Sequence, residues 1–292
     1  MIYSVNHTTR YEFSGPVFLE PHILRLFPRC DGTQRIIEHQ LEIVPAPAGF
    51  SRGLDLWGNS FALAWFEGLH SSLLIESYLG IKTLRDNPFD FYLPEGSTTL
   101  PISLGPHERE ALGSSLKRMS GAGNNADLVS STADSCLKSS QGDTLAFLAS
   151  VNTWIAGNIQ RVERSEPGII DPLDLLRHGK GSCRDLAALF MDMCRVCGIP
   201  SRLVSGYQEG DPEVYEAELH AWAEVYLPGA GWRGYDPTHG LAASDRHIPL
   251  AAAPEPENTM PVSGTYRGTD ITSQIRHRVT MAADPAQPQG LT

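Results

Sequence analysis

The chain is short of basic residues and of long apolar runs, and both shortages exclude classes of partner. Its 292 residues carry 23 lysines and arginines against 34 aspartates and glutamates, a formal charge of −11. No basic cluster alternates with aromatics, as a nucleic-acid groove or a surface for anionic membranes requires. The apolar runs are far too short to span a membrane, and residues 1–7 lack the basic and apolar regions of a secretory signal. We therefore expect an unprocessed, cytoplasmic protein without nucleic-acid or membrane partners.

Cysteines are also few, and five are scattered along the chain: Cys30, Cys136, Cys183, Cys194 and Cys197. An odd and widely spaced set fits a reducing compartment better than a disulfide scaffold. Cys194 and Cys197 have the spacing of a redox or zinc pair. Both fall on the apolar face of a predicted helix, however, and no second pair follows. We therefore favour core packing for these two.

Residues 1–95 are predicted to form a small antiparallel β-domain, because apolar and polar residues alternate there in short runs. Two strand faces are predicted from mostly apolar residues at every second position: Ile37, His39, Leu41 and Ile43 on one strand, and Phe61, Leu63 and Trp65 on another. A turn at residues 58–59 precedes the second strand. The composition shifts to serine, glycine and asparagine over residues 112–141, so we expect a connector over residues 96–143, part helical and part mobile.

A second domain is predicted over residues 144–270. Thr144, Asp171 and Ser182 each precede helical spacing of apolar residues, and strands follow over 202–207, 219–227 and 232–236. Residues 271–292 are expected to form a frayed C-terminal tail, because residues 281–292 carry two prolines and no apolar pattern. The fold class is therefore α+β, with helices packed on an antiparallel sheet and a small all-β domain in front.

Cys183 lies at the first position of the third predicted helix. Ser182 is a good N-cap, and Asp185 is placed to complete a capping box. The free N–H groups and the helix dipole at this end favour a thiolate, which is the nucleophilic form of cysteine. A helical wheel places Cys183 on the apolar stripe, so its side chain points toward the structure on which the helix packs.

His220 and Asp236 are predicted to face each other across a hairpin. Residues 228–231 form a short turn between two strands. If Tyr226 pairs with Trp232, Asp236 falls on the same face as His220 and diagonal to it, at about 7–8 Å between backbones. The carboxylate would then orient the His220 ring and leave its other nitrogen for Cys183. A slip by one residue would move Asp236 to the opposite face.

Several motifs resemble, in order and spacing, the core of the transglutaminase-like superfamily. They are GSCRD (181–185), CRVCGIPSR (194–202), VSGY (204–207), HAWAEVY (220–226) and GWRGYDPT (231–238). The resemblance implies a papain-like α+β core with Cys183 as nucleophile, His220 as base and acid, and Asp236 as the orienting residue. Residues 3–29 and the motif DLWGN (55–59) are similar to the N-terminal β-domain of bacterial transglutaminase-like proteins.

Other residues admit two interpretations. His239 and His247 could join His220 and Asp236 at a metal, but they lie in loops without fixed ligand spacing, so we expect no metal and no cofactor. Trp222 is a candidate substrate-binding residue, but packing is an equally good interpretation of it. The same two interpretations apply to Trp232. A group of acidic residues lies just before His220, and we interpret it as a solvated loop rather than as a surface that attracts a cationic amine substrate. Its members are Glu209, Asp211, Glu213, Glu216 and Glu218. The second oxyanion-hole donor is left unassigned, because the segment around the upstream Trp154 does not match that of animal transglutaminases.

These residues predict acyl transfer from an amide. The Cys183 thiolate attacks the carbonyl, His220 protonates the leaving amine, and water or a second amine resolves the thioester. We favour hydrolysis of a peptide or small-molecule amide, as by a protease or amidase. Transfer to an amine, which cross-links proteins, and a non-catalytic peptide-binding module are the alternatives. The sequence does not indicate the oligomeric state.

Overall fold

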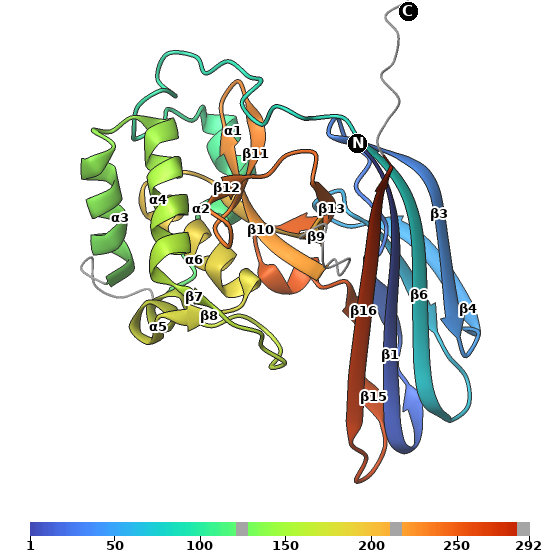
Figure 1. The fold of residues 1–292 in the computed structure, drawn as a ribbon. Coiled ribbons are helices and arrows are strands. Elements are labelled where there is room, and N and C mark those ends of the chain that lie inside the picture. The colour runs from blue at the N-terminus through green and yellow to red at the C-terminus, as the bar shows by residue number, and fades with distance from the viewer. Residues whose placement is uncertain (121–127, 211–217, 285–292) are drawn as a thin grey trace, which may run out of the picture.

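The computed structural model describes residues 1–120, 128–210 and 218–284. Two antiparallel sheets form the β-rich half of the molecule (Figure 1). The larger sheet has the order β15-β1-β6-β3, with β16 also paired to β1, and the smaller has the order β14-β2-β5-β4. Their strands are β1 (Ile2–Leu19), β2 (His22–Leu24), β3 (Gln34–Val44), β4 (Gly49–Leu54), β5 (Ser60–Trp65), β6 (His70–Thr83), β14 (Val262–Ser263), β15 (Tyr266–Arg267) and β16 (Ser273–Asp284). Buried side chains from both sheets form one apolar core.

The predicted strands are present, but two of their faces differ from expectation. A bulge between Ile36 and Glu38 turns Ile37 outward, where it is 58% exposed, while Ile36 packs against the core. On β5 the buried residues are Ala62 and Ala64. The larger side chains of β5 lie on the other face, where the rings of Phe61 and Trp65 cover two glycines of β4.

The expected C-terminal tail is wrong for residues 273–284, which form β16 beside β1 (Figure 1). The pairing runs without interruption from Ile2 opposite Asp284 to Phe13 opposite Ser273. Apart from Val279, the described side chains of β16 are partly or fully exposed. Backbone hydrogen bonds to β1 hold such a strand, and apolar periodicity does not reveal it. Strands β14 and β15 also belong to the β-rich half, so the core ends before the predicted boundary at residue 270.

The second half has helices packed on a five-stranded antiparallel sheet in the order β12-β11-β10-β9-β13, which confirms the α+β prediction (Figure 1). Its strands are β9 (Ser201–Gln208), β10 (Glu218–Leu227), β11 (Gly231–Asp236), β12 (Leu241–Ala242) and β13 (His247–Ala253). Its helices are α1 (Pro106–Ala111), α2 (Gly113–Leu116), α3 (Leu128–Ser139), α4 (Thr144–Asn158), α5 (Pro172–His178) and α6 (Cys183–Val196), with a 3-10 turn over Pro256–Thr259. The short β7 (Gln160–Arg161) and β8 (Lys180–Gly181) pair in parallel. Among the described residues, no helix combines the length and apolarity needed to cross a membrane.

The predicted connector contains a helix of the core. In α3, Val129, Ala133 and Cys136 are buried in the same apolar cluster as α4 and α6. These three small residues are spaced by four and three positions, and the serines and threonines around them conceal the pattern. Part of the segment that we expected to be mobile, residues 121–127, lies outside the described residues. Helix α4 is capped by Asp143, whose carboxylate accepts the Ala146 N–H, rather than by Thr144.

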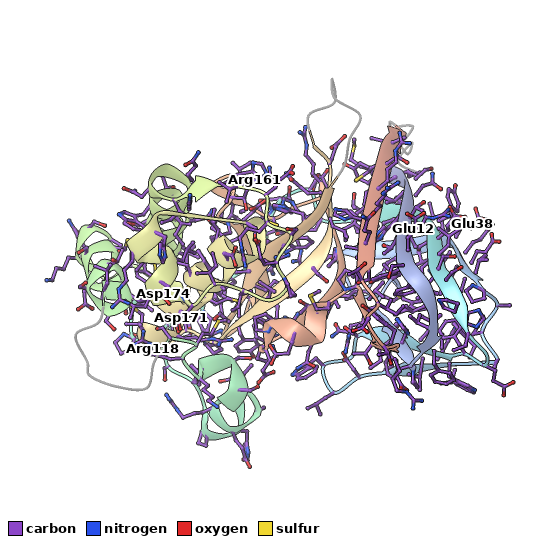
Figure 2. The ribbon with its side chains drawn as sticks, turned by 90° about the horizontal axis from the view of Figure 1, so that it is seen from below. Glu12, Glu38, Arg118, Arg161, Asp171 and Asp174 are labelled. Atoms are coloured by element: carbon purple, nitrogen blue, oxygen red, sulfur yellow. The ribbon has the colours of Figure 1, made fainter. Side chains whose placement is uncertain are left out.

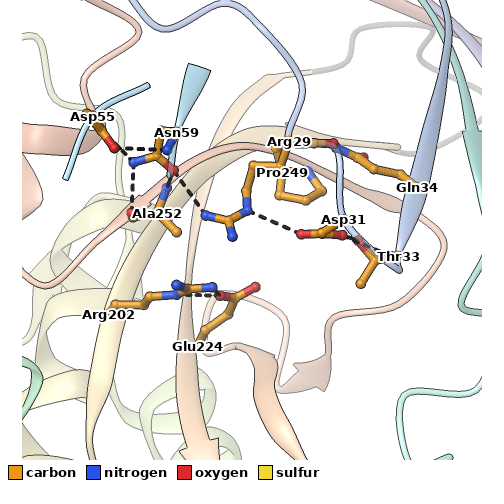
Figure 3. A network of polar contacts seen from close by, with 10 residues as sticks. All are labelled: Arg29, Asp31, Thr33, Gln34, Asp55, Asn59, Arg202, Glu224, Pro249 and Ala252. Carbon is orange, nitrogen blue, oxygen red and sulfur yellow. Dashed lines mark hydrogen bonds and ion pairs between the residues drawn. The ribbon is translucent and has the colours of Figure 1, made fainter. Parts of the chain in front are cut away.

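The DLWGN motif joins the two halves (Figure 3). The Asn59 side chain bonds Ala252 of β13 as a neighbouring strand would, donating to its carbonyl at 2.9 Å and accepting its N–H at 2.8 Å. Asp55 Oδ2 and Arg29 Nη1 hold the Asn59 amide at 2.9 and 3.0 Å. Gln34 Nε2 also donates to the carbonyl of Pro249, at 2.9 Å. The β-rich half therefore fixes the edge strand β13 of the core sheet.

Candidate active site

The start of α6 is tied to its surroundings by the buried carboxylate of Asp185. Asp185 Oδ2 accepts the Ser182 N–H at 2.8 Å, which completes the predicted capping box. Arg164 Nη1 lies 2.8 Å from both carboxylate oxygens, and the Ile170 N–H donates to Oδ1 at 2.8 Å. Burial raises the pKa of Asp185, but the donors from Ser182, Ile170 and Arg164 outweigh it and the net pKa is lowered. This network places Cys183 at the first position of α6, as predicted.

Cys183, His220 and Asp236 form one hydrogen-bonded chain. His220 Nε2 lies 2.8 Å from Asp236 Oδ2, and both residues are buried, with 3% and 0% of their surface exposed. The sulfur of Cys183 is hydrogen-bonded to the His220 side chain and accepts the Ala221 N–H. Cys183 is only partly buried, so a reagent can reach it. The pairing of Tyr226 with Trp232, on which the prediction depended, is confirmed.

The three groups shift one another's pKa. Burial raises the pKa of the Cys183 thiol, but the His220 hydrogen bond and charge outweigh it, and the net pKa is lowered. Burial lowers the pKa of His220, but Asp236 and Cys183 together raise it to about 9. Burial also raises the pKa of Asp236, yet hydrogen bonds from His220 and His247 hold it far below its ordinary value. Near neutral pH His220 is therefore an imidazolium, and its charge favours the thiolate form of Cys183.

Comparison with known proteins identifies this architecture. A model of the transglutaminase-like superfamily matches residues 130–237, and one of the bacterial transglutaminase-like N-terminal region matches residues 3–81. The chain therefore has a transglutaminase-like core behind a bacterial transglutaminase-like N-terminal region. The core match contains Cys183, His220 and Asp236, and it also covers most of α3.

Three similar proteins illustrate the range of the relatives. An uncharacterized protein of Mycobacterium leprae is 23% identical over 283 residues, covering 92% of this chain and 94% of the relative. The kyphoscoliosis peptidase of Mus musculus is 34% identical over 101 residues, covering 32% of this chain and 15% of that protein. A crystal structure from Cytophaga hutchinsonii, named "Putative Cysteine Protease", matches with a TM-score of 0.70 at 17% identity, covering 99% of this chain and 93% of the other. This last likeness shows a shared fold.

Trp222 is buried beside His220 in this transglutaminase-like core. It is 2% exposed and packs in a small cluster with Val204 and Ala252. Its ring stacks against His220, with 6.3 Å between centroids, so it forms the buried wall behind that ring. Of the two interpretations of Trp222, its burial favours packing; strand alternation gives the face of a side chain and not what covers that face. Trp232, the other candidate, is half-buried, and the Arg202 guanidinium lies 4.0 Å from its ring centroid.

The histidines considered for a metal take separate places in the transglutaminase-like core. His239 is exposed, and its Nε2 lies 3.1 Å from Gln208 Oε1. One nitrogen or oxygen atom each of His220, Asp236 and His239 lies within 4.8 Å of the others, but the first two are hydrogen-bonded to each other. His247 is buried and contacts Asp236, a position that the hairpin argument could not find because β13 pairs with β9 and not with β11.

The remaining candidates lie away from the hydrogen-bonded chain of Cys183, His220 and Asp236 in the transglutaminase-like core. Cys194 and Cys197 carry free thiols in the helical core, as predicted. Burial raises the pKa of Cys194 well above its ordinary value and that of Cys197 to about 11, so neither is an activated thiolate. Trp154 packs against the same core. Of the acidic group, Glu209 accepts the Tyr3 hydroxyl at 2.9 Å; Asp211, Glu213 and Glu216 and the side chain of Glu218 lie outside the described residues.

Proposed function

We propose that this protein is a cysteine-dependent hydrolase that cleaves an amide or peptide bond through a thioester. The observation that carries the proposal is the hydrogen-bonded chain from the partly buried Cys183, at the start of α6, to the buried His220 and Asp236. A thiol of lowered pKa beside an oriented histidine is the arrangement of an activated cysteine nucleophile. Most inert buried cysteines instead have a raised pKa, as Cys194 and Cys197 do.

The geometry supports a two-step reaction. The Cys183 thiolate attacks the amide carbonyl carbon, and the oxyanion that forms is stabilised by the Cys183 N–H and the positive end of α6. The C–N bond then breaks as His220 gives its proton to the leaving amine, which departs and leaves a thioester. Water attacks the thioester, His220 accepts its proton, and release of the carboxylic acid restores the thiolate. Asp236 holds the His220 ring and stabilises its positive charge throughout.

Hydrolysis is the favoured second step for this chain. A structure of the same fold is named "Putative Cysteine Protease", and a relative of the core is named a peptidase. We infer that the substrate is a peptide or a small-molecule amide. Transfer to an amine would use the same thioester, so the nature of the second step is an outcome of the test rather than an assumption.

The test compares the parent protein with Cys183→Ala on a library of peptide amides, with Cys30→Ala as the matched control. Cys30 is also a free thiol, but it is exposed and belongs to the β-rich half. We expect turnover to disappear in Cys183→Ala and to persist in Cys30→Ala. Incorporation of oxygen from labelled water identifies hydrolysis, whereas incorporation of an added amine identifies transfer. Equal turnover by the parent and Cys183→Ala would refute the enzymatic proposal.

A further inference from the structure

Two histidine rings share one oxygen of Asp236. His220 Nε2 lies 2.8 Å from Asp236 Oδ2, and His247 Nε2 lies 3.2 Å from the same atom. The side chain of His247 is 5% exposed and that of Asp236 is 0% exposed. The Thr238 N–H donates to the other oxygen, Oδ1, at 3.0 Å. A buried carboxylate oxygen that accepts two donors divides its negative charge between them.

The loop before β13 determines which nitrogen of His247 donates. The Ser244 N–H donates to His247 Nδ1 at 3.4 Å, so Nδ1 acts as an acceptor and the ring proton lies on Nε2. In return, the backbone N–H of His247 donates to the Ser244 carbonyl at 3.1 Å. Trp222 packs edge-on against the ring, with 5.1 Å between centroids. The backbone thus directs a single ring N–H toward the Asp236 carboxylate.

His247 is the first residue of β13, the strand that the β-rich half fixes. On one side it pairs with Gln208 of β9, and further along β13 the side chains of Gln34 and Asn59 bond Pro249 and Ala252. Besides the packing of Trp222 against its ring, His247 is therefore placed by backbone contacts that lie outside the β10–β11 hairpin carrying His220 and Asp236. It is an independent support for the carboxylate.

We propose that His247 is a positioning residue for the Cys183–His220–Asp236 chain: it donates Nε2–H to Asp236, holds the carboxylate and limits the negative charge that reaches His220. The proposal rests on the catalytic roles proposed above. Without His247, Asp236 Oδ2 would be left to His220 alone, and the stronger hydrogen bond would keep the proton on His220 to higher pH. A histidine that holds its proton too tightly is a poorer acid for the leaving amine.

Other charged groups face the same two rings. Cys183 approaches His220 from α6, and His239 approaches both rings from the loop after β11. Arg161 on β7, labelled in Figure 2, contributes its positive charge to Cys183 and His239. Because a thiolate beside His220 would couple to its titration, the effect of His247 is best measured with Cys183 replaced by alanine.

The experiment compares three complete 292-residue chains labelled with ¹⁵N at histidine. The first carries Cys183→Ala alone, the second combines Cys183→Ala with His247→Leu, and the third combines Cys183→Ala with His247→Gln. Leucine fills the space but donates nothing, whereas the glutamine amide places an N–H near the position of Nε2. NMR titration of His220 is expected to give a midpoint higher by about half to one pH unit in the leucine chain, a three- to tenfold change in proton affinity. The glutamine chain should stay within about 0.3 unit of the Cys183→Ala reference. An unchanged or lowered midpoint in the leucine chain would overturn the proposal.

A second measurement needs no substitution at His247. In the Cys183→Ala chain, the ¹⁵N shifts of His247 should show a protonated Nε2 and an unprotonated Nδ1. A proton on Nδ1 would overturn the proposal even if the leucine chain did not fold. Neither readout depends on turnover, so failure of the proposed enzymatic activity would be recognised separately, by equal turnover of the parent and Cys183→Ala.

Discussion

Replacing Asp236 by asparagine should uncouple His220 from the thiol. The rise of the His220 pKa from its ordinary 6.5 to about 9 corresponds to about 3 kcal/mol in favour of the imidazolium. Burial opposes this charge, and the Asp236 hydrogen bond is the first of the contributions that overcome it. With asparagine, burial is opposed by Cys183 alone, so His220 should lose its proton below neutral pH. The pKa of Cys183 should rise in turn, because its lowering depends on the charge of His220.

Orientation should suffer as well as charge. An asparagine amide can donate to His220 Nε2, which would place the ring proton on the nitrogen that faces Cys183. In that tautomer the ring cannot accept a proton from the thiol. In a serine protease the equivalent change lowers turnover by about 10⁴-fold, and we expect about 10³- to 10⁴-fold here.

The assay is the rate of Cys183 alkylation by iodoacetamide, measured by mass spectrometry across pH. The parent should reach its plateau rate at a lower pH than an ordinary thiol, because the pKa of Cys183 is lowered, and His220 should keep its proton up to about pH 9. Asp236→Asn should react at least about tenfold more slowly at pH 6 and then accelerate with pH, as an ordinary thiol does. Asp174→Asn is the matched control, because Asp174 is exposed on α5 and pairs with its neighbour Arg177. A plateau in Asp236→Asn equal to that of the parent would refute the reasoning.

Three further substitutions test the supports of the site. Arg164→Leu leaves the buried Asp185 carboxylate without its ion pair and should lower the free energy of unfolding by about 3 kcal/mol in urea titrations. The pKa of Asp185 is lowered in the fold, so the ion pair stabilises the parent above about pH 4. This stabilisation should vanish as the pH falls through the pKa that Asp185 has in the folded protein. Asn59→Ala removes both hydrogen bonds to Ala252 and should cost about 2–4 kcal/mol, measured in the same way; a loss below about 0.5 kcal/mol would contradict the docking role. Gly206→Ala would place a Cβ 2.1 Å from the Ile248 carbonyl oxygen and 2.7 Å from the Trp222 ring, so the melting temperature should fall sharply, whereas Gly32→Ala, with open space around it, should leave it unchanged.

Local signals account for the parts of the site that could be predicted. Ser182 and Asp185 determine where α6 begins, and a short turn with clear alternation on both sides determines the register of the β10–β11 hairpin. Both depend on residues close together in sequence, where capping and pairing rules apply directly. Together they place the thiol, the imidazole and the carboxylate without knowledge of the rest of the fold.

The features that were missed depend on partners distant in sequence. Strand β16 exists because β1, more than 250 residues earlier, offers it an unpaired edge. Trp222 is buried because residues of β9 and β13 cover its face of the sheet. His247 contacts Asp236 from β13, a strand that pairs with β9 and not with the β10–β11 hairpin. In each case the deciding contact is tertiary, and the local pattern is silent about it.

The β-rich half has a physical role in the site, and the DLWGN motif shows how it is exerted. Asn59 fixes β13 by bonding both backbone groups of Ala252, and β13 begins at the histidine that contacts Asp236. Apolar residues of β9 and β13, among them Tyr207 and Ile248, complete the core of the β-rich half. A chain without that half would expose these side chains and leave the edge of β13 unpaired, so His247 would lose the contacts that aim it. The surroundings of the Asp236 carboxylate, though not its place on the β10–β11 hairpin, therefore depend on both halves together.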